Sequence, residues 1–388
     1  MPPKEQAPKK VLFGRSSNTL TMGVVGLANV GKSTFFNVLT NSQVPAENYP
    51  FCTIDPTTAR AQVPDERWEH LCESYKPKRR IPAFLQVTDI AGLIKGASEG
   101  KGLGNQFLSN ISAVDGIYHV VRIFEDEDIV HVEGSVDPCR DLDIVCSELR
   151  MKDIEVLTSK VEGLERIVGR TNDKVKKFEL DTIKKCIELM KSGTDVRFGK
   201  WEPNEVEVIN TFGLLTTKPQ VVLVNMNKES YIHKRGRHVL QVKQWVDEHQ
   251  PGESMILFSA DLERELSEMT PEDRENFCKE NKTASAIPKI ILVGYSALSL
   301  IHFFTAGEDE VRCWTIRHGT KAPRAGAVIH TDFEKGFVCV ETMKYEDFKA
   351  LGSEKAVKEA GKNVTKGKDY EVADGDILLF RYNLGQKK

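Results

Sequence analysis

The sequence has no long hydrophobic run, no strong excess of charge and no paired-cysteine motif. No apolar segment reaches the roughly 18 residues of a membrane-spanning helix, and the first ten residues are polar and rich in proline and lysine. The eight cysteines form no C-x-x-C pair and no cluster with histidine, which is typical of a reduced compartment. We therefore expect a soluble cytoplasmic protein with no membrane partner.

The charge balance gives no global basic field of the kind that indicates a nucleic-acid partner. The formal net charge is −3 at pH 7 and the pI is about 6.4, so any RNA contact must come from local patches. The chain of 388 residues is 40% hydrophobic, which suffices for two or three domains with ordinary cores.

Residues 26–33 read G-x-x-x-x-G-K-S, with an apolar run before them and a helical pattern after them. This is the strand, loop and helix context of a phosphate-binding P-loop. Gly26 and Gly31 allow the tight turn, Lys32 can neutralise the β- and γ-phosphates, and the Ser33 hydroxyl can bind Mg²⁺. The alternative is a glycine-rich turn with a chance lysine, which would not require a strand before it and a helix after it.

Two later segments are typical of nucleotide switches. The proline-bounded residues 46–56 cannot be helical, and Thr53 is the candidate that would complete the Mg²⁺ shell, with Thr57 and Thr58 as rivals and a turn-capping threonine as the alternative. A predicted strand at 84–88 ends in D-x-x-G. There Asp89 would hold a Mg²⁺-bound water, and the Gly92 amide could reach the γ-phosphate.

The chain lacks the glutamine that orients water in many GTPases, because Leu93 follows D-x-x-G. We therefore expect slow intrinsic hydrolysis, on the order of 10⁻⁴ to 10⁻² s⁻¹. Two histidines could substitute. His119 lies in an apolar strand and fits a core residue better, whereas His131 follows an acidic loop and is the better catalytic candidate, although a surface histidine fits the composition equally.

Apolar residues recur every three or four positions between about 141 and 197, with a polar break at 169–174. This pattern predicts two helices of some 20–25 residues that fold back on each other as an arm of roughly 30–37 Å. The alternative is a helical pair packed onto the core.

The positions that read the base follow predicted strands at 220–224 and 255–258. The first strand leads into Asn225 and Met226, and the second into Ser259 and Ala260. Guanine is normally read by the aspartate of N-K-x-D, and this chain has Lys228 at the fourth position from Asn225. The sequence therefore favours adenine, whose N6 amino group could donate to a backbone carbonyl or to the Asn225 side chain.

The remaining chain predicts a small α+β domain. Residues 271–282 have the composition of an amphipathic linker, and Ile287-Pro288 marks a boundary. Short strands are predicted at 311–316, 327–329, 336–340 and 376–382, with a helix at 345–351.

Together these motifs resemble the YchF group of Obg-like ATPases, within the translation-factor class of P-loop GTPases. The segments that carry the resemblance are GLANVGKST at 26–34, PFCTIDP at 50–56, DIAGLIKGA at 89–97, GLGNQFL at 102–108, NMNKE at 225–229, FFTAGEDEVRCWTI at 303–316 and IHTDFEKGF at 329–337. The resemblance implies an α/β fold, in which a P-loop G domain carries an inserted coiled-coil arm and is followed by an α+β β-grasp (TGS) domain. It also implies Mg²⁺-dependent hydrolysis of ATP in preference to GTP, and association with ribosomes or ribosomal subunits in the cytoplasm and sometimes the nucleus.

Functional residues of the family can be carried over position by position. The phosphate loop corresponds to Asn29, Val30, Gly31, Lys32, Ser33 and Thr34, and the Mg²⁺ ligands correspond to Ser33 and Thr53. The adenine contacts correspond to Asn225 and the Met226 backbone. The histidine proposed for hydrolysis corresponds to His131. Leu93 matches the hydrophobic replacement of the catalytic glutamine. One departure is that the family usually has N-x-x-E, whereas this chain has Lys228 followed by Glu229.

We therefore expect a tail at 1–18, a G domain at 19–283 with a helical insertion at about 141–197, and a TGS domain at 301–384. The function that fits is a Mg²⁺-dependent ATP switch that binds ribosomes in translation regulation, with no DNA partner. Two rivals are a GTPase of ribosome assembly and a non-catalytic scaffold that uses nucleotide only structurally.

Overall fold

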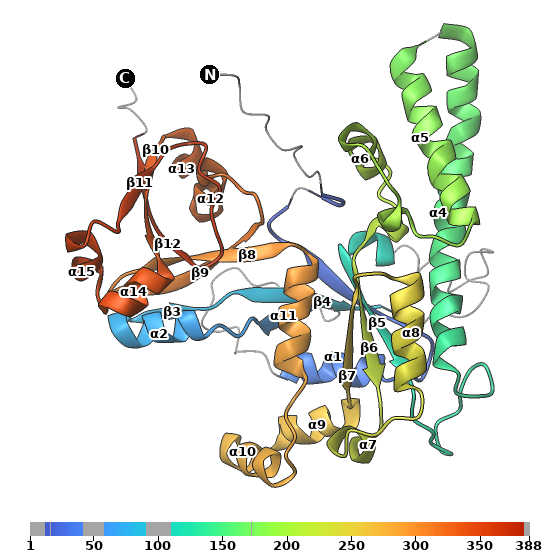
Figure 1. Ribbon diagram of the computed structural model, residues 1–388, viewed down its shortest axis with the longest axis horizontal. Helices are drawn as coiled ribbons and strands as arrows, with labels where there is room; N and C mark the ends of the chain where they lie inside the picture. The colour runs from blue at the N-terminus through green and yellow to red at the C-terminus, as the bar shows by residue number, and fades with distance from the viewer. Residues whose placement is uncertain (1–11, 16, 42–57, 91–109, 172, 384–388) are drawn as a thin grey trace.

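The computed structural model describes residues 12–15, 17–41, 58–90, 110–171 and 173–383. Two six-stranded sheets organise these residues, and a helical arm projects from the first (Figure 1). Within the described ranges, no helix combines the length and the apolar character needed to cross a bilayer.

The first sheet has the strand order β2-β4-β1-β5-β6-β7. These strands are β1 (Thr21–Val25), β2 (Thr58–Gln62), β4 (Phe84–Asp89), β5 (Gly116–Arg122), β6 (Gln220–Asn225) and β7 (Ser254–Phe258). All neighbours are parallel except the edge pair β2 and β4. The sheet confirms the predicted α/β class and most of the predicted strands.

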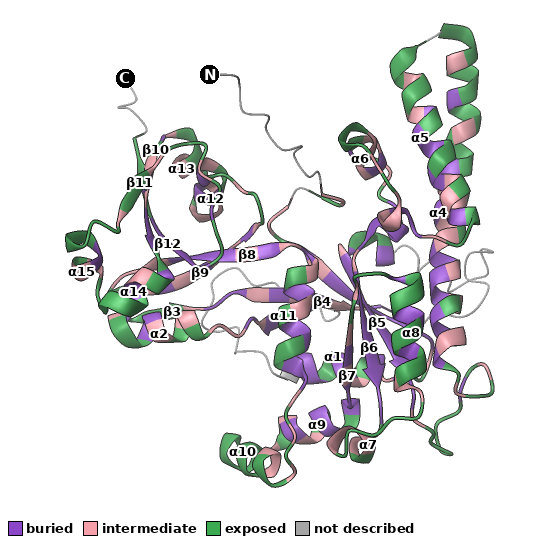
Figure 2. Ribbon diagram, viewed as in Figure 1, coloured by how far each residue is buried: buried purple, intermediate pink, exposed green. Residues whose placement is uncertain are grey.

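Helices cover both faces of this sheet, which explains why its central strands are continuously apolar. In β6, Val221 and Leu223 belong to one core cluster, while Val222 and Val224 belong to another. The first cluster includes residues of α1 (Lys32–Asn41), α9 (Ala260–Glu268) and α11 (Ile287–Ala297), and the second includes residues of α8 (Val239–His249). Because successive side chains of a strand point to opposite faces of the sheet, side chains on both faces are buried (Figure 2).

The arm consists of α4 (Pro138–Thr171) and α5 (Lys174–Lys191), which lie side by side (Figure 1). The Asp173 side chain caps α5 by accepting from the amides of Val175 and Lys176 at 2.8 and 3.2 Å. The predicted helical pair is confirmed, but α4 has 34 residues, longer than the expected 20–25, and its first turns pack against the sheet core through Leu142 and Cys146. At 1.5 Å per residue, α4 extends about 50 Å.

Shorter helices and turns lie in the chain between α5 and β8 (Leu300–Ala306). They are α6 (Pro203–Asn210), α7 (Lys228–Ile232) and α10 (Pro271–Glu280), with 3₁₀ turns η3 (Val196–Phe198) and η4 (Leu215–Thr217). The predicted linker at 271–282 is therefore mostly a helix, capped by Thr270. The predicted boundary at Ile287-Pro288 is instead the first turn of α11, where proline fits because its missing N–H would be unpaired anyway.

The second sheet has the order β11-β10-β12-β8-β9-β3. Its C-terminal strands are β8 (Leu300–Ala306), β9 (Glu310–Arg317), β10 (Phe337–Lys344), β11 (Val364–Lys366) and β12 (Asp376–Tyr382). Helices α12 (Ala322–Ile329), α13 (Thr331–Lys335), α14 (Tyr345–Leu351) and α15 (Glu354–Glu359) complete this part. The strand predicted at 327–329 is wrong, because these residues end α12, whose Ala322 and Ala325 are buried in the local core.

One strand of the second sheet comes from the N-terminal part of the chain. Residues Arg79–Ile81 form β3, which pairs in parallel with β9, and α2 (Glu66–Tyr75) contacts both β8 and β9. The two sheets are therefore joined by backbone pairing as well as by side chains.

Candidate functional site

The P-loop adopts the geometry that its glycines predict. Gly31 has φ +98°, and a Cβ added there would collide with the Asn225 amide group, while a Cβ at Gly26 would collide with the carbonyl oxygen of Val120. Asn29 also has a left-handed φ of +62°. Glycine is required where backbone turns this way and approaches a neighbour closely.

Lys32 begins α1 and is buried in the loop. Its Nζ donates to the carbonyl oxygen of Leu27 at 2.6 Å. Burial lowers the pKa of Lys32 to about 8, although the nearby Asp89 carboxylate opposes that shift. A phosphate group there would stabilise the charged ammonium, as a P-loop lysine requires.

Ser33 and Asp89 lie together beside Lys32, as predicted. Ser33 Oγ lies 3.5 Å from Asp89 Oδ2, and Asp89 Oδ1 is buried with no hydrogen-bond partner among the described residues. Burial raises the pKa of Asp89, and Lys32 and Ser33 oppose that shift. An unpaired carboxylate oxygen beside a hydroxyl fits a hard cation such as Mg²⁺. These two residues would hold the ion, directly or through water.

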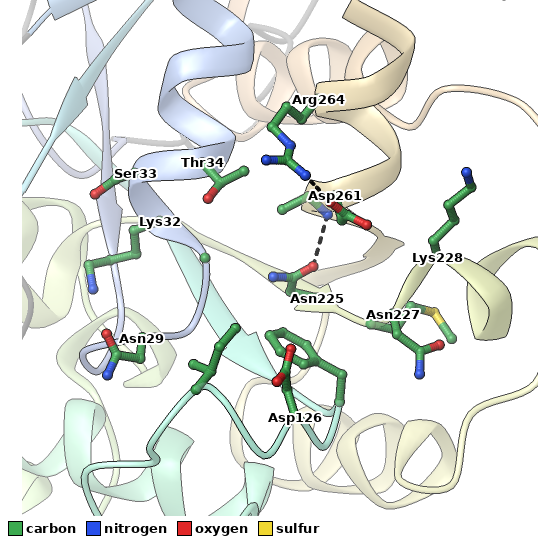
Figure 3. A pocket seen from close by; sticks show the side chains of 15 residues that line it. Asn29, Lys32, Ser33, Thr34, Asp126, Asn225, Asn227, Lys228, Asp261 and Arg264 are labelled. Atoms are coloured by element: carbon green, nitrogen blue, oxygen red, sulfur yellow. Dashed lines mark hydrogen bonds and ion pairs between the residues drawn. The ribbon is translucent and has the colours of Figure 1, made fainter.

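Asn225 joins the P-loop to the end of β7. Its Nδ2 donates to the carbonyl oxygen of Val30 at 2.9 Å, and its Oδ1 accepts from the amide of Ala260 at 2.9 Å (Figure 3). Ser259 is fully buried and caps α9 by accepting from the Leu262 amide at 3.4 Å. The side chain of Asn225 therefore supports the loop from beneath and also lines the cavity.

A cavity of about 600 Å³ opens over these groups (Figure 3). Its lining contains most of the predicted nucleotide-binding residues, namely Asn29, Gly31, Lys32, Ser33, Thr34, Asn225, Met226 and Ala260. The structure thus brings together residues predicted from three separate stretches of sequence. Val30 and Ser259 are buried behind that lining.

The opposite wall of the cavity was not predicted. Phe124, Asp126 and Ile129 line it from the loop after β5, and Asp261 and Arg264 line it from α9. Asn29 Nδ2 donates to the carbonyl oxygen of Val130 at 3.0 Å, which joins that loop to the P-loop. The available signal was the acidic run at 125–128, which follows a buried parallel strand at the sheet edge where ligands bind.

Lys228, at the position of the guanine-reading aspartate, lines the cavity but its ammonium has partners outside it. Nζ forms an ion pair with Glu265 of α9 and lies 5.2 Å from the centre of the Phe277 ring in α10. Asn227 caps α7 by accepting from the Ser230 amide at 2.8 Å. The polar ends of both side chains are therefore engaged locally.

His131 is 8% exposed and does not line the cavity. Its Nε2 lies 2.8 Å from Asp141 Oδ2, and its Nδ1 accepts from the Glu133 amide at 3.1 Å. Burial raises the pKa of Asp141, although Arg140 and His131 oppose that shift. Both ring nitrogens are occupied in this conformation, so a catalytic role would require His131 to leave Asp141. His119 is also buried, as expected of a core residue.

Three predicted switch residues, Thr53, Gly92 and Leu93, lie outside the described residues, as does the rival Thr57. The other rival, Thr58, begins β2, where its hydroxyl lies 3.2 Å from that of Thr88. Because the Thr58 hydroxyl is close to that of Thr88 on the neighbouring strand, Thr58 fits a role in strand pairing better than one in Mg²⁺ binding.

Comparisons with known proteins agree with this geometry. Residues 21–160 match the MMR_HSR1 family, described as "50S ribosome-binding GTPase", and residues 300–383 match the YchF-GTPase_C family, described as "Protein of unknown function (DUF933)". Obg-like ATPase 1 of Oryza sativa subsp. japonica is 52% identical over 395 residues, covering 100% of both chains. Obg-like ATPase 1 of Homo sapiens is 53% identical over 392 residues, covering 100% of this chain and 99% of the relative.

A solved structure described as the Schizosaccharomyces pombe YchF GTPase superposes with a TM-score of 0.89 at 49% identity, covering 96% of this chain and 100% of that one. The likeness thus includes the P-loop domain, the arm and the C-terminal part. The chain belongs to the Obg-like ATPases, the YchF family of P-loop nucleotide hydrolases.

Proposed function

We propose that this protein is a Mg²⁺-dependent switch that binds and slowly hydrolyses ATP in preference to GTP. The observation that carries the base preference is the placement of Lys228. Guanine recognition needs a carboxylate that accepts from N1 and N2, and here the ammonium of Lys228 is paired with Glu265 instead. The relatives named Obg-like ATPase 1 support the same choice.

Carboxylates on the cavity wall supply acceptors for the base. Asp126 and Asp261 provide carboxylate oxygens, whereas the guanidinium of Arg264 is paired with Asp261 at 2.5 Å. Adenine offers an N6 amino donor to such acceptors, whereas guanine offers the acceptor O6. A carboxylate opposite this edge of the base would attract adenine and repel guanine, whereas one opposite N1 and N2 would attract guanine, so the preference rests on Lys228.

Chemistry at the phosphates would use the groups described above. Lys32 would neutralise the phosphate oxygens. Ser33 and the predicted ligand Thr53 would hold Mg²⁺ directly and Asp89 would hold it through water, and the ion would supply further charge stabilisation. Leu93 cannot orient water, so turnover would be slow unless His131 leaves Asp141 to do so. His131→Ala should then lower kcat without weakening nucleotide binding.

The deciding experiment is calorimetric titration of the full chain with Mg²⁺ and slowly hydrolysed analogues of ATP and GTP. The proposal predicts tighter binding of the ATP analogue. Equal or tighter binding of the GTP analogue would overturn it in favour of the GTPase, a rival that the description of the Schizosaccharomyces pombe relative favours.

We further propose that the switch acts on ribosomes or ribosomal subunits in the cytoplasm, with the nucleus as a second compartment. The description of the matched P-loop family and the arm, whose α4 has 34 residues, support this partner. The C-terminal α+β part would be the TGS domain that completes the contact. A non-catalytic scaffold would instead bind ribosomes equally with ATP analogue and with ADP, and its His131→Ala variant would be unchanged.

A further inference from the structure

Arg122, the last residue of β5, lies directly beneath the loop that forms the outer wall of the cavity. Its side chain is 1% exposed and is the largest among the fully buried side chains of the described residues. Burying a guanidinium is costly unless its donors are satisfied. The partners that satisfy it therefore indicate what it does.

Those partners are backbone carbonyls of the wall itself. Nε donates to Phe124 O at 2.9 Å, Nη1 to Ile129 O at 3.0 Å and Nη2 to Asp126 O at 3.4 Å. These are the same three residues whose side chains line the cavity. The guanidinium carbon also lies 4.4 Å from the centre of the Phe124 ring.

Among the described residues, few other hydrogen bonds tie residues 124–130 to the rest of the protein, although Ile123 at the start of the loop donates to Asn225 O at 3.0 Å. Residues 125–130 are all exposed, and four of them in succession are acidic. Besides Arg122, the P-loop contact is the bond from Asn29 to Val130 O, and the pair between Arg237 and Glu125 is exposed on both sides. Arg122 is thus the buried anchor of a loop that otherwise lies in solvent.

We propose that Arg122 is a positioning residue for nucleotide binding, which fixes the loop at 123–130 in the conformation that completes the wall around the nucleoside. It touches no ligand itself and acts through three backbone carbonyls. Its planar fork can serve three acceptors in different directions, whereas the ammonium of lysine is a compact charge on a flexible stem. This inference rests on nucleotide binding in the cavity but not on the choice of base.

The test compares Arg122→Lys and Arg122→Met with the wild type, in the full chain with Mg²⁺. The nucleotide is whichever analogue the wild type binds more tightly. Arg122→Lys should weaken that affinity about tenfold and speed amide hydrogen exchange at 123–130 but not at the P-loop. With the corresponding hydrolysable nucleotide at saturation, its kcat should stay within about twofold of the wild type. Arg122→Met should show a larger loss, and the lysine variant decides the matter if the methionine variant does not fold.

Arg197→Lys is the matched control. The side chain of Arg197 is likewise shielded, at 6% exposed, but its partners are Asp195 and Glu253, and it does not line the cavity. Its replacement should lower thermal stability without changing nucleotide affinity. Arg122 would be merely structural if its variants kept wild-type affinity. The same would follow if Arg197→Lys weakened nucleotide binding as much as Arg122→Lys. A wild-type preference for GTP would overturn the proposed function and leave this test intact.

Discussion

Burial sets the acid–base behaviour of individual residues in this site. Lys32 and Lys218 both have a pKa lowered to about 8 because burial disfavours the ammonium, yet their surroundings differ. Lys32 lines the cavity, whereas Lys218 donates to the carbonyl oxygens of Ile111 and Ser112 at 2.8 and 3.1 Å. Only the first lysine is placed to meet phosphate.

Nucleotide affinity should therefore fall at alkaline pH. Above pH 8 the free protein loses the Lys32 proton, and phosphate binding must take that proton up again, so affinity should be flat below pH 8 and fall by up to about tenfold per pH unit above it. Titrations at pH 7, 8 and 9 in buffers of different ionisation enthalpy would measure both affinity and proton uptake. Lys218→Met is the control and should keep the same pH dependence. An affinity that stays constant to pH 9 would contradict this account of Lys32.

At the scale of elements, local sequence patterns were sufficient to predict a helix, strand or loop whose structure depends mainly on its own residues. The P-loop, β5, β6 and the helical arm follow from glycine spacing and apolar periodicity. The errors came from contacts distant in sequence. β3 forms only because β9 offers an edge, and residues 327–329 are helical because α12 packs on the second sheet. Phe124 and Arg122 were missed for the same reason, since their role depends on the cavity between loops.

The buried carboxylate of Asp153 anchors the arm. Asp153 of α4 accepts from the amides of Leu215 and Thr216 at 2.9 and 2.8 Å and from the Thr216 hydroxyl at 2.7 Å. Burial raises the pKa of Asp153 to about 6, against the effect of these hydrogen bonds. The carboxylate thus ties α4 to η4, at the base of the arm.

Asp153→Ala should destabilise the fold by about 3 kcal/mol, because it leaves buried donors without an acceptor. A carboxyl whose pKa is raised on folding favours the folded state below its unfolded pKa, and this contribution is lost as pH rises through about 6. The cost of the mutation should therefore be larger at pH 4.5 than at pH 7 in denaturant unfolding. Asp181→Ala, at an exposed position of α5, should change stability by less than about 0.5 kcal/mol. Equal costs for the two variants would refute the anchor.

At the scale of the whole molecule, a partly buried ionic cluster beside β3 helps to hold the two sheets together. Asp65, the N-cap of α2, accepts from His302 Nε2 of β8 at 2.7 Å and from Arg67, which also pairs with Asp374 at 2.9 Å. Burial alone would raise the pKa of Asp65, but the hydrogen bonds from His302 and Arg67 hold it well below its usual range. The nucleotide-binding and C-terminal parts should therefore move as one body near neutral pH.

Replacing Asp65 should uncouple the nucleotide-binding part from the C-terminal part. Asp65→Ala removes the helix cap and leaves the charges of Arg67 and its neighbours poorly paired, so we expect a loss of about 3–5 kcal/mol and faster amide exchange in both β3 and β9. The stabilisation is present above about pH 4 and lost as pH falls further, because the depressed pKa favours the folded state only while the unfolded carboxyl is ionised. Lys78→Ala is the matched control: it removes an ion pair with Asp309 from the same junction, but both side chains are 80% exposed, so the cost should stay below about 1 kcal/mol. If Asp65→Ala changed stability while exchange in β3 and β9 stayed at wild-type rates, the cluster would stabilise α2 alone, and the coupling of the two sheets would have to come from strand pairing.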